Sequence, residues 1–397
     1  IDPDSNPAEY FATMKYPDDH WSHITSSNGL GEIADASGYD KGFGYNLTFW
    51  EKKGYIFADV NFVYPNSPAA KAGLKRGDLI THMNGERMTT DNYTDLYYAS
   101  QLSLGLSNDE TSEPYETKTL TAQTYAIDPV LDYGLIPLEH LTIGYMIYTD
   151  FVFRGNASLA QLNHVFQTLK AANIDEFILD LRYNQGGYIF AVKQLCSLLA
   201  LEEVVENEEL LIHKKWNKAY QERYANDPDR LEEHFDNTVP LDSRLNLKRL
   251  WVITSHVTAS ASEMLISALS PYMKVNVVGD LTMGKNMGGI IYTPNDKDLQ
   301  NWNIMLISTE YSNSREESVK GGIPPMFPIL EQFHHQHQLG DQEEPLLAAT
   351  LQLITQDTIV TPATNSRSGR NIGTDAPRRI IPEFVQAKSR LLLGIEN

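Results

Sequence analysis

The 397-residue sequence has a single cysteine, no long hydrophobic run and a shortage of positive charge. With Cys196 as the only cysteine, an intramolecular disulfide is excluded. No stretch of about 18 apolar residues occurs, which argues against a transmembrane segment. Lysine and arginine number 32 against 52 acidic residues, and the net charge of −20 argues against nucleic acid or anionic membranes as partners.

The sequence also lacks the usual metal-binding motifs. It contains no His-Glu-x-x-His and no Cys-x-x-Cys pattern, and only the cluster of His334, His335 and His337 invites a zinc interpretation. We therefore predict no metal and no cofactor. Hydrophobic residues make up 42% and charged residues 21% of the chain, which is typical of a globular protein with two or three domains.

A serine lies at the junction of a predicted strand and a predicted helix. Residues 250–254 form a short apolar run that is typical of a buried strand. From Ala261 the apolar residues follow helical spacing, which predicts a helix that ends near Pro271. Ser260 is therefore predicted at the helix N-terminus, where unpaired N–H groups and the helix dipole stabilise a tetrahedral oxyanion.

A lysine follows this helix in a glycine-containing loop. Residues 275–279 predict another strand, and Lys285 comes shortly after it. A serine hydroxyl needs a neighbouring base, and a lysine that is desolvated in an apolar pocket loses its proton more easily and can act as one. The alternative is structural, because Ser260 or Ser262 could simply cap the helix while Glu263 completes a capping box.

A second strand, turn and helix pattern lies earlier in the chain. Residues 177–181 predict a strand, and Gly186 and Gly187 permit a turn with positive φ that could supply another oxyanion donor. In the alternative interpretation the glycines only allow a tight connection in an α/β sheet. Asp180 and Arg182 are predicted to be a buried pair that shapes this turn, rather than direct reactants.

Together these segments resemble the C-terminal processing peptidases, also called tail-specific proteases. The family pattern comprises an Asp-Leu-Arg-x-Asn-x-Gly-Gly turn, a Ser-Ala-Ser-Glu segment and a Thr-x-Gly-Lys loop. Matching stretches begin here at Asp180, Ser260 and Thr282, in the same order. The separation of 25 residues between Ser260 and Lys285 also matches the family register. The resemblance covers most of residues 10–355.

The resemblance implies a role for each of these residues. It implies that Ser260, rather than Ser262, is the catalytic nucleophile and that Lys285 is its general base. It further implies that the oxyanion hole is formed by the Ala261 N–H and by an N–H of the turn at Gly186 and Gly187.

One departure from the family pattern lies close to the lysine. Many members carry a glutamine four residues after the lysine that helps to orient it, and this chain has Gly289 there. Asn286 is a candidate substitute for that amide. The departure keeps an alternative open, in which the chain is a non-catalytic, peptide-binding PDZ scaffold on a degenerate protease core.

Residues 62–80 resemble a PDZ domain. Ser67-Pro68 is typical of the start of a short helix, and Gly73 is typical of its end. Asn84-Gly85 predicts a hairpin turn after the following strand. These features predict a small β-domain of the PDZ kind.

A glycine-rich segment before this region resembles the loop with which PDZ domains bind a peptide carboxylate. The segment is Gly42-Phe43-Gly44, and residues 45–49 after it would form the strand that pairs with the peptide backbone. The alternative is a β-domain with only a structural or gating role.

We therefore predict an α/β protein with three parts. These are a short helical N-terminal segment at 1–38, a PDZ-like domain at 39–126 and a crotonase-like α/β serine peptidase core at 127–397. The predicted function is that of an endopeptidase that uses a Ser-Lys dyad on polypeptide substrates, near or recognised through their C-terminal tails.

The two ends of the sequence lead to further expectations. Residues 1–7 are typical of a flexible linker left after a targeting segment, and the family resemblance suggests export to a bacterial periplasm or a lipid anchor that preceded this sequence. Residues 14–22 resemble a short helical lead-in of the family. Residues 356–380 are expected to be a surface excursion before a final helix at 382–393.

Overall fold

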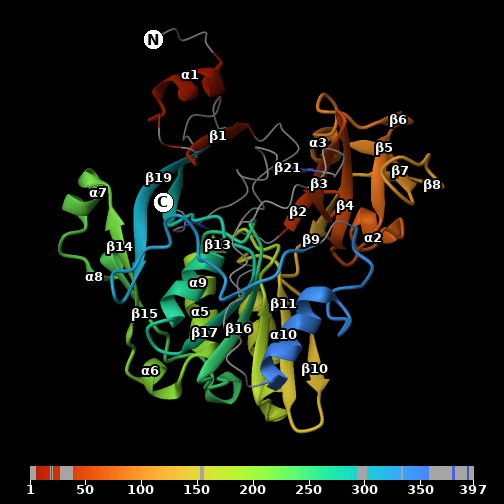
Figure 1. Ribbon diagram of the computed structural model, residues 1–397. Coiled ribbons are helices and arrows are strands. Elements are labelled where there is room, and N and C mark those ends of the chain that lie inside the picture. Colours follow the sequence, from red (N-terminus) through yellow and green to blue (C-terminus); the bar gives the residue numbers. More distant parts are fainter. Residues whose placement is uncertain are drawn as a thin grey trace. The chain divides into compact units, whose positions relative to one another are not determined.

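The computed structural model describes residues 6–17, 19, 21–26, 39–152, 156–292, 302–331, 334–356, 378–380 and 391–392. Helices and strands are mixed throughout, which confirms the predicted α/β class (Figure 1). The chain divides into two compact units, one from 1–28, 129–329 and 387–397 and the other from 29–128 and 330–386. Residues 330–386 thus cluster with the predicted PDZ-like region and not with the rest of the predicted core. Within the described ranges, no helix is long and apolar enough to cross a membrane.

The first unit is built on a six-stranded sheet. Its strand order is β10-β11-β12-β16-β17-β20, with β10 antiparallel to β11 and all later neighbours parallel. The strands are β10 (Val130–Pro137), β11 (Thr142–Tyr148), β12 (Glu176–Asp180), β16 (Arg249–Thr254), β17 (Lys274–Gly279) and β20 (Phe327–Pro328). Parallel strands are covered on both faces, which explains why the inner strands read as continuous apolar runs.

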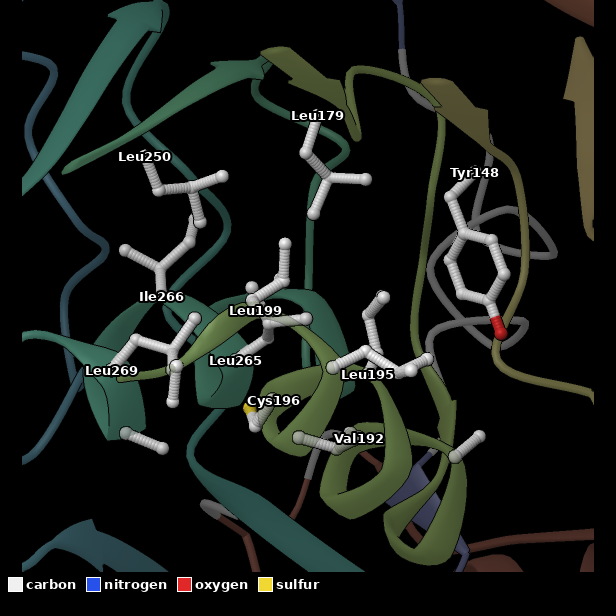
Figure 2. Packing of buried hydrophobic residues seen from close by; sticks show 14 of the residues in the cluster. Tyr148, Leu179, Val192, Leu195, Cys196, Leu199, Leu250, Leu265, Ile266 and Leu269 are labelled. Atoms are coloured by element: carbon white, nitrogen blue, oxygen red, sulfur yellow. The ribbon is translucent and has the colours of Figure 1, made fainter. Parts of the chain in front are cut away.

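The helices of this unit include the one predicted to begin at Ala261. They are α4 (Asn156–Ala171), α5 (Ile189–Leu199), α6 (Glu202–Glu206), α7 (Lys218–Arg223), α8 (Pro228–Leu231) and α9 (Ala261–Leu269), with a 3-10 turn at Leu241–Ser243. Helices α5 and α9 pack on each other and bury their apolar side chains against the sheet (Figure 2). Cys196 lies in this core, and burial raises the pKa of its thiol.

A second sheet belongs to the same unit. Its order is β13-β22-β18-β19-β14-β15, and β1 pairs with β19. The strands are β1 (His23–Ser26), β13 (Gly187–Tyr188), β14 (Leu210–Trp216), β15 (Glu232–His234), β18 (Met287–Tyr292), β19 (Trp302–Asn313) and β22 (Leu391–Leu392). Strand β22 shows that the expected final helix does not continue to its predicted end at 393. The rest of that prediction, 382–390, lies outside the described residues.

The N-terminal helix lies earlier than the expected lead-in. Helix α1 spans Pro7–Met14, with Pro7 in its first turn and the side chain of Asn6 accepting the Ala8 N–H. The described residues between Lys15 and Ser22 are not helical. Pro17 accounts for this, because it disfavours a helical conformation for the residue before it.

The second unit holds the predicted PDZ-like sheet. Its order is β21-β3-β4-β5-β7-β8, with β6 on β5, and β2 pairs separately with β9. The elements are β2 (Tyr39–Gly42), β3 (Tyr45–Lys52), β4 (Tyr55–Val63), α2 (Pro68–Lys71), β5 (Leu79–Met83), β6 (Glu86–Arg87), α3 (Asp95–Tyr98), β7 (Gln101–Ser107), β8 (Glu116–Thr121), β9 (Gln123–Ala126), α10 (Pro345–Gln356) and β21 (Arg378–Ile380).

Local signals in this unit are confirmed. The Ser67 hydroxyl accepts the Ala70 N–H and caps α2, and Gly73 follows the helix with a φ of 72°. Asn84 and Gly85 both adopt positive φ between β5 and β6, as a tight hairpin turn requires. Strand β21 lies inside the expected surface excursion at 356–380, of which 357–377 is outside the described residues.

Candidate active site

The predicted serine lies at a strained turn between β16 and α9. Ser260 has φ 59° and ψ −114°, a conformation that side-chain-bearing residues rarely adopt. Its side chain is buried, and its Oγ makes no hydrogen bond within the part of the chain that the structure describes. The turn therefore presents an unengaged hydroxyl directly before the first turn of α9.

The lysine loop is attached to this turn by one carboxylate. Lys285 lies between β17 and β18, and only 2% of its surface is exposed. Its N–H donates to Glu263 Oε2 at 2.9 Å, and the Ser260 N–H donates to the same oxygen at 2.8 Å. Because a single oxygen accepts both bonds, the serine turn and the lysine loop are held side by side.

Glu263 is the most heavily bonded carboxylate of the site. Its other oxygen, Oε1, accepts the Thr282 hydroxyl at 2.5 Å and the Gly284 N–H at 2.6 Å. Burial raises the pKa of Glu263, and the hydrogen bonds from Thr282 and from the three N–H groups oppose that rise. From the sequence this residue was interpreted only as part of a helix cap, and its role in joining two loops was missed.

The glycine turn after β12 lies against the serine turn through Asn184. The carbonyl of this buried residue accepts the Ala259 N–H at 3.1 Å and the Ser262 hydroxyl at 3.1 Å. Its Oδ1 accepts the Gly186 N–H at 2.9 Å. Of the two predicted donors in this turn, Gly186 therefore already has its N–H in an internal hydrogen bond.

Gly187 needs to be a glycine. Its φ is 144°, and an added Cβ would lie 2.4 Å from the Phe151 carbonyl oxygen. Any side chain would force the backbone of the turn away from Phe151, whose carbonyl accepts the Tyr188 N–H. The sequence prediction of a conformational demand at this turn is thus confirmed.

Asp180 and Arg182 form the predicted buried pair. The guanidinium of Arg182 donates from both Nε and Nη2 to the Asp180 carboxylate, at 2.8 Å for Nη2 to Oδ2. Tyr145 adds its hydroxyl to the same carboxylate at 2.8 Å. Both charged side chains are almost completely enclosed. The pair fixes the end of β12 just before the glycine turn.

Ser260 and Lys285 open onto one pocket. Its mostly apolar wall comes from α9, β14 and β19, and its remaining lining comes from the lysine loop and the segment after β19. The lining residues are Ile212, Ser260, Met264, Ser267, Lys285, Asn286, Tyr311, Ser312, Asn313, Glu317 and Val319. Burial raises the pKa of Tyr311 well above its usual value, so this phenol is neutral at physiological pH.

Gly289 stands where many family members have a glutamine, and Asn286 is the candidate substitute for that amide. Gly289 lies in β18, and an added Cβ would approach the Leu306 carbonyl oxygen to 2.7 Å. The backbone therefore leaves no room for a longer side chain at this position. The amide of Asn286, the candidate substitute, donates to the Ser318 hydroxyl at 2.9 Å.

The second unit places the predicted peptide loop next to α2. The Phe43 carbonyl accepts the Ala69 N–H and the Gly44 carbonyl accepts the Tyr64 N–H, each at 2.8 Å. The Phe43 ring is buried and stacks on Tyr45. Gly42 ends β2, so Gly42, Phe43 and Gly44 connect β2 to the strand that was predicted to receive a peptide.

The three clustered histidines do not converge on one point. His334 lies beside Asp59, His335 Nε2 lies 3.1 Å from the Asn61 amide oxygen, and His337 Nδ1 lies 3.2 Å from Asp341. The ligand atoms of His337, Asp341 and Glu343 lie within 4.8 Å of one another on the exposed surface. The cluster in the sequence is therefore dispersed over separate polar contacts.

Comparison with known proteins agrees with this arrangement. The chain matches Peptidase family S41 over residues 142–328 and the PDZ domain over residues 60–102. It is 28% identical over 282 residues to carboxyl-terminal-processing peptidase 2 of Arabidopsis thaliana chloroplasts, covering 68% of this chain and 49% of that protein. It is 27% identical over 239 residues to the carboxy-terminal processing protease CtpB of Bacillus subtilis strain 168, covering 56% and 42%.

The chain thus spans about half the length of the curated relatives it matches. A crystal structure from Bacteroides fragilis NCTC 9343, assigned to the S41 proteases, matches 90% of this chain and 92% of its own with a TM-score of 0.73 and 24% sequence identity. That likeness shows the fold. The matched domains and these homologues show that the chain carries a Peptidase family S41 domain and a PDZ domain and is homologous to carboxyl-terminal processing proteases.

Proposed function

We propose that this protein is a serine endopeptidase that uses Ser260 and Lys285 as a catalytic dyad on polypeptides presented through their C-terminal tails. The observation that carries the proposal is the pairing of these residues at one pocket. The Ser260 hydroxyl is buried and has no hydrogen-bond partner in the described chain, and Glu263 attaches its turn to the backbone of Lys285.

The chemistry follows from these positions. Ser260 Oγ attacks the carbonyl carbon of the scissile peptide bond while its proton passes to the neutral amine of Lys285. The protonated lysine then gives that proton to the leaving nitrogen, and the C–N bond breaks. Water, deprotonated by the same amine, hydrolyses the acyl-enzyme. Burial of Lys285 favours the neutral amine that this sequence of steps requires.

The developing oxyanion would be stabilised by backbone donors. The Ala261 N–H lies at the first position of α9, where helical N–H groups have no partner within the helix. The second donor is assigned to Gly187, because the Gly186 N–H is held by Asn184. Gly187 has φ 144°, and an added Cβ would collide with the Phe151 carbonyl oxygen, so a residue with a side chain would distort this turn.

The second unit is proposed to bind the substrate tail. In PDZ domains a peptide adds to a sheet edge, and its terminal carboxylate is held by N–H groups of the loop before that strand. The corresponding loop here is Gly42-Phe43-Gly44, and the corresponding strand is β3, with which β21 pairs. The expected partner is therefore a polypeptide with a free C-terminus.

The decisive experiment is digestion of a peptide library with free and with amidated C-termini, followed by mass spectrometry of the products. We expect internal cleavage that is faster for the free carboxylates. Cleavage that ignores the terminus removes the tail-recognition part of the proposal. Binding without any cleavage would instead support a non-catalytic peptide-binding scaffold.

Glu263 provides a first prediction. Replacing it with alanine leaves three backbone N–H groups and the Thr282 hydroxyl without an acceptor in a buried site. Since each unsatisfied buried donor costs about 1–3 kcal/mol, the free energy of unfolding should fall by roughly 3 kcal/mol or more. Urea unfolding followed by circular dichroism measures this change.

Glu263→Gln is the gentler variant. It keeps the volume but turns an NH₂ group towards N–H donors, which displaces the lysine loop, and we expect cleavage to fall by about 100-fold. The half-exposed Glu310 on β19 serves as a matched control. Glu310→Gln should change neither the free energy of unfolding nor the rate of cleavage. Normal activity in Glu263→Gln would show that the shared carboxylate does not position the dyad.

The proposal also includes export from a bacterial cell, with or without a lipid anchor. Its support is that the homologues include bacterial processing proteases such as that of Bacillus subtilis. Fractionation of the source cells, followed by detection of the protein, tests it. Recovery in the cytoplasmic fraction alone would contradict export.

A further inference from the structure

The amine of Lys285 lies against the ring of Trp21. Its Nζ is 4.8 Å from the ring centroid, although the two residues are far apart in the sequence. Trp21 belongs to the first unit, as does Lys285. Its segment was interpreted from the sequence only as a lead-in, so no role in the site was predicted for it.

Several hydrogen bonds hold Trp21 in this place. Asp19 Oδ1 accepts the N–H groups of Trp21 and Ser22 at 3.0 and 2.8 Å. Burial opposes ionisation of Asp19, yet the hydrogen bonds from Ser22 and Trp21 outweigh it and lower the pKa of this carboxyl. The Ser22 hydroxyl accepts the Ile307 N–H at 2.9 Å. Strand β1 then pairs with β19 from the next residue onward.

Position 289 has no side chain that could orient the lysine. Many family members orient this lysine with a glutamine four residues later, and here the backbone of β18 leaves room only for Gly289. The nitrogen of the Asn286 amide donates to the Ser318 hydroxyl. The aromatic ring of Trp21 lies against the amine, with its centroid 4.8 Å from Nζ.

We infer that Trp21 is a positioning residue for Lys285, which holds the amine in one place and keeps water from it. This inference rests on the proposed function of Lys285 as the base. The ring acts in two opposing ways, because its face attracts a cation whereas its bulk removes the water that stabilises the charge. Removal of water has the larger effect, since full burial can displace a titration by 3–5 pH units.

In the part of the chain that the structure describes, the titratable groups that line the pocket or bond the lysine loop include Glu263 on α9, Tyr311 on β19 and Glu317 after β19. Trp21 differs from all of them, because it has no charge to exchange with the lysine. A change at Trp21 therefore alters solvation and position without adding or removing a titrating group.

The test compares Trp21→Leu, Trp21→Phe and the wild-type chain in cleavage assays from pH 5 to pH 10. In Trp21→Leu we expect the acidic limb of the kcat profile to move upward by about one pH unit, with a loss of about tenfold at pH 7 that recovers at high pH. KM should change little. Trp21→Phe should shift the acidic limb by less than Trp21→Leu, because phenylalanine keeps an aromatic face.

A second readout does not depend on activity. In the Ser260→Ala background, the rate of Lys285 acetylation by acetic anhydride reports the neutral amine, and mass mapping of peptides measures it at each pH. We expect the midpoint to rise in Trp21→Leu. Tyr16→Leu is the matched control, since this aromatic lies in the same segment and is 71% exposed. It should leave both profiles unchanged.

The outcomes separate this inference from the proposed function. If Lys285→Met still cleaves peptide, the proposed dyad fails and the role of Trp21 fails with it. If Lys285→Met is inactive but Trp21→Leu has the wild-type pH profile, or loses activity equally at every pH, only the role of Trp21 is overturned.

A different observation concerns the edge of the PDZ sheet. Strand β21 pairs antiparallel with β3, with Arg378 opposite Glu51 and Ile380 opposite Phe49. Ile380 packs against the apolar core of this unit. Arg379 places its guanidinium 5.7 Å from the Trp50 ring centroid and donates to the Thr48 hydroxyl at 3.4 Å. The chain itself thus occupies the edge on which a peptide was predicted to add.

The direction of β21 is that of a ligand. From 378 to 380 it runs against β3 from 51 to 49, and so towards the start of β3 and the Gly42-Phe43-Gly44 loop. A PDZ ligand runs in the same sense, because its terminal carboxylate is held by the loop before the strand. The segment therefore matches an extended peptide in hydrogen-bonding pattern and in polarity.

The geometry points to self-competition: residues 378–380 occupy the β3 edge and must leave before an extended polypeptide with a free C-terminus can bind along it. This inference also rests on the proposed function, in its peptide-binding part. The contacts are few and partly exposed, so the segment can be displaced by a longer ligand.

Peptide affinity tests this competition. Fluorescence anisotropy with a labelled ten-residue apolar peptide that has a free C-terminus is measured on the Ser260→Ala chain, with and without the pair Arg379→Glu and Ile380→Ser. We expect the weakened β21 to tighten binding at least about fivefold. Arg378→Ala is the control, because its ion pair with Glu51 involves a 76% exposed arginine side chain, and such exposed pairs contribute little, so it should have little effect.

Each outcome has a separate meaning. Equal or weaker binding by the double variant overturns self-competition and leaves the peptide-binding proposal intact. If neither chain binds the peptide, self-competition and the peptide-binding proposal are both overturned. Cleavage by the dyad is tested separately, in the digestion assay.

Discussion

Ser260→Ala is expected to abolish peptide cleavage while leaving the fold intact. The Ser260 hydroxyl makes no hydrogen bond in the described chain, so its removal breaks no contact that stabilises the fold. Loss of a nucleophile whose chemistry depends on a base lowers turnover by about 10⁴-fold or more. Lys285→Met should have an effect of the same size, because it keeps the apolar stem and removes the base.

Ser262→Ala is the matched control for this prediction. Ser262 lies two residues further along α9, and its hydroxyl donates to the Asn184 carbonyl at 3.1 Å. We expect this variant to lose about 1 kcal/mol of stability and to retain most of its activity. Product analysis by mass spectrometry, with thermal unfolding beside it, distinguishes the serines. A reversed result, with Ser262→Ala inactive and Ser260→Ala active, would show that Ser262 is the nucleophile.

Arg182→Met is expected to be the most destabilising single substitution near the site. It leaves the Asp180 carboxylate enclosed without its guanidinium partner, while the Tyr145 hydroxyl and the backbone N–H of residue 182 still donate to it. Removing one partner of a buried ion pair costs about 3–5 kcal/mol. Urea unfolding of the whole chain measures the loss. Activity should fall as well, because the pair fixes the strand end from which the glycine turn departs.

A double variant separates the charge effect from loss of packing. Asp180→Asn with Arg182→Met removes both charges, and we expect it to be more stable than Arg182→Met alone. Arg249→Met is the matched control on β16, because its ion pair with Glu176 is partly exposed, and it should cost about 1 kcal/mol or less. Equal costs for the Arg182 single variant and the double variant would show that the buried charge is not the cause.

The sequence was sufficient for the local structure around Ser260. The apolar run at 250–254 and the helical spacing after Ala261 predicted β16 and α9, and Ser260 lies at their junction as expected. Such predictions succeed because hydrophobic periodicity, proline and glycine act within a few residues. The same reasoning placed the helix of the PDZ-like region correctly.

The sequence was less reliable near the termini. The expected lead-in at 14–22 is not helical, and α1 instead ends at Met14. Strands β21 and β22 form where an irregular excursion and a helix were expected. Short segments of this kind have weak preferences of their own, and they become strands because an existing sheet edge supplies their hydrogen bonds.

By itself, therefore, the sequence determined the turn on which Ser260 stands, since that turn depends on neighbours within one strand and one helix. Only the tertiary structure decided that Glu263 joins the two loops, that Trp21 covers Lys285 and that β21 lies on β3. Each of these contacts joins segments that are distant in the chain. Such contacts are fixed by sheet pairing and close packing, which local periodicity does not encode.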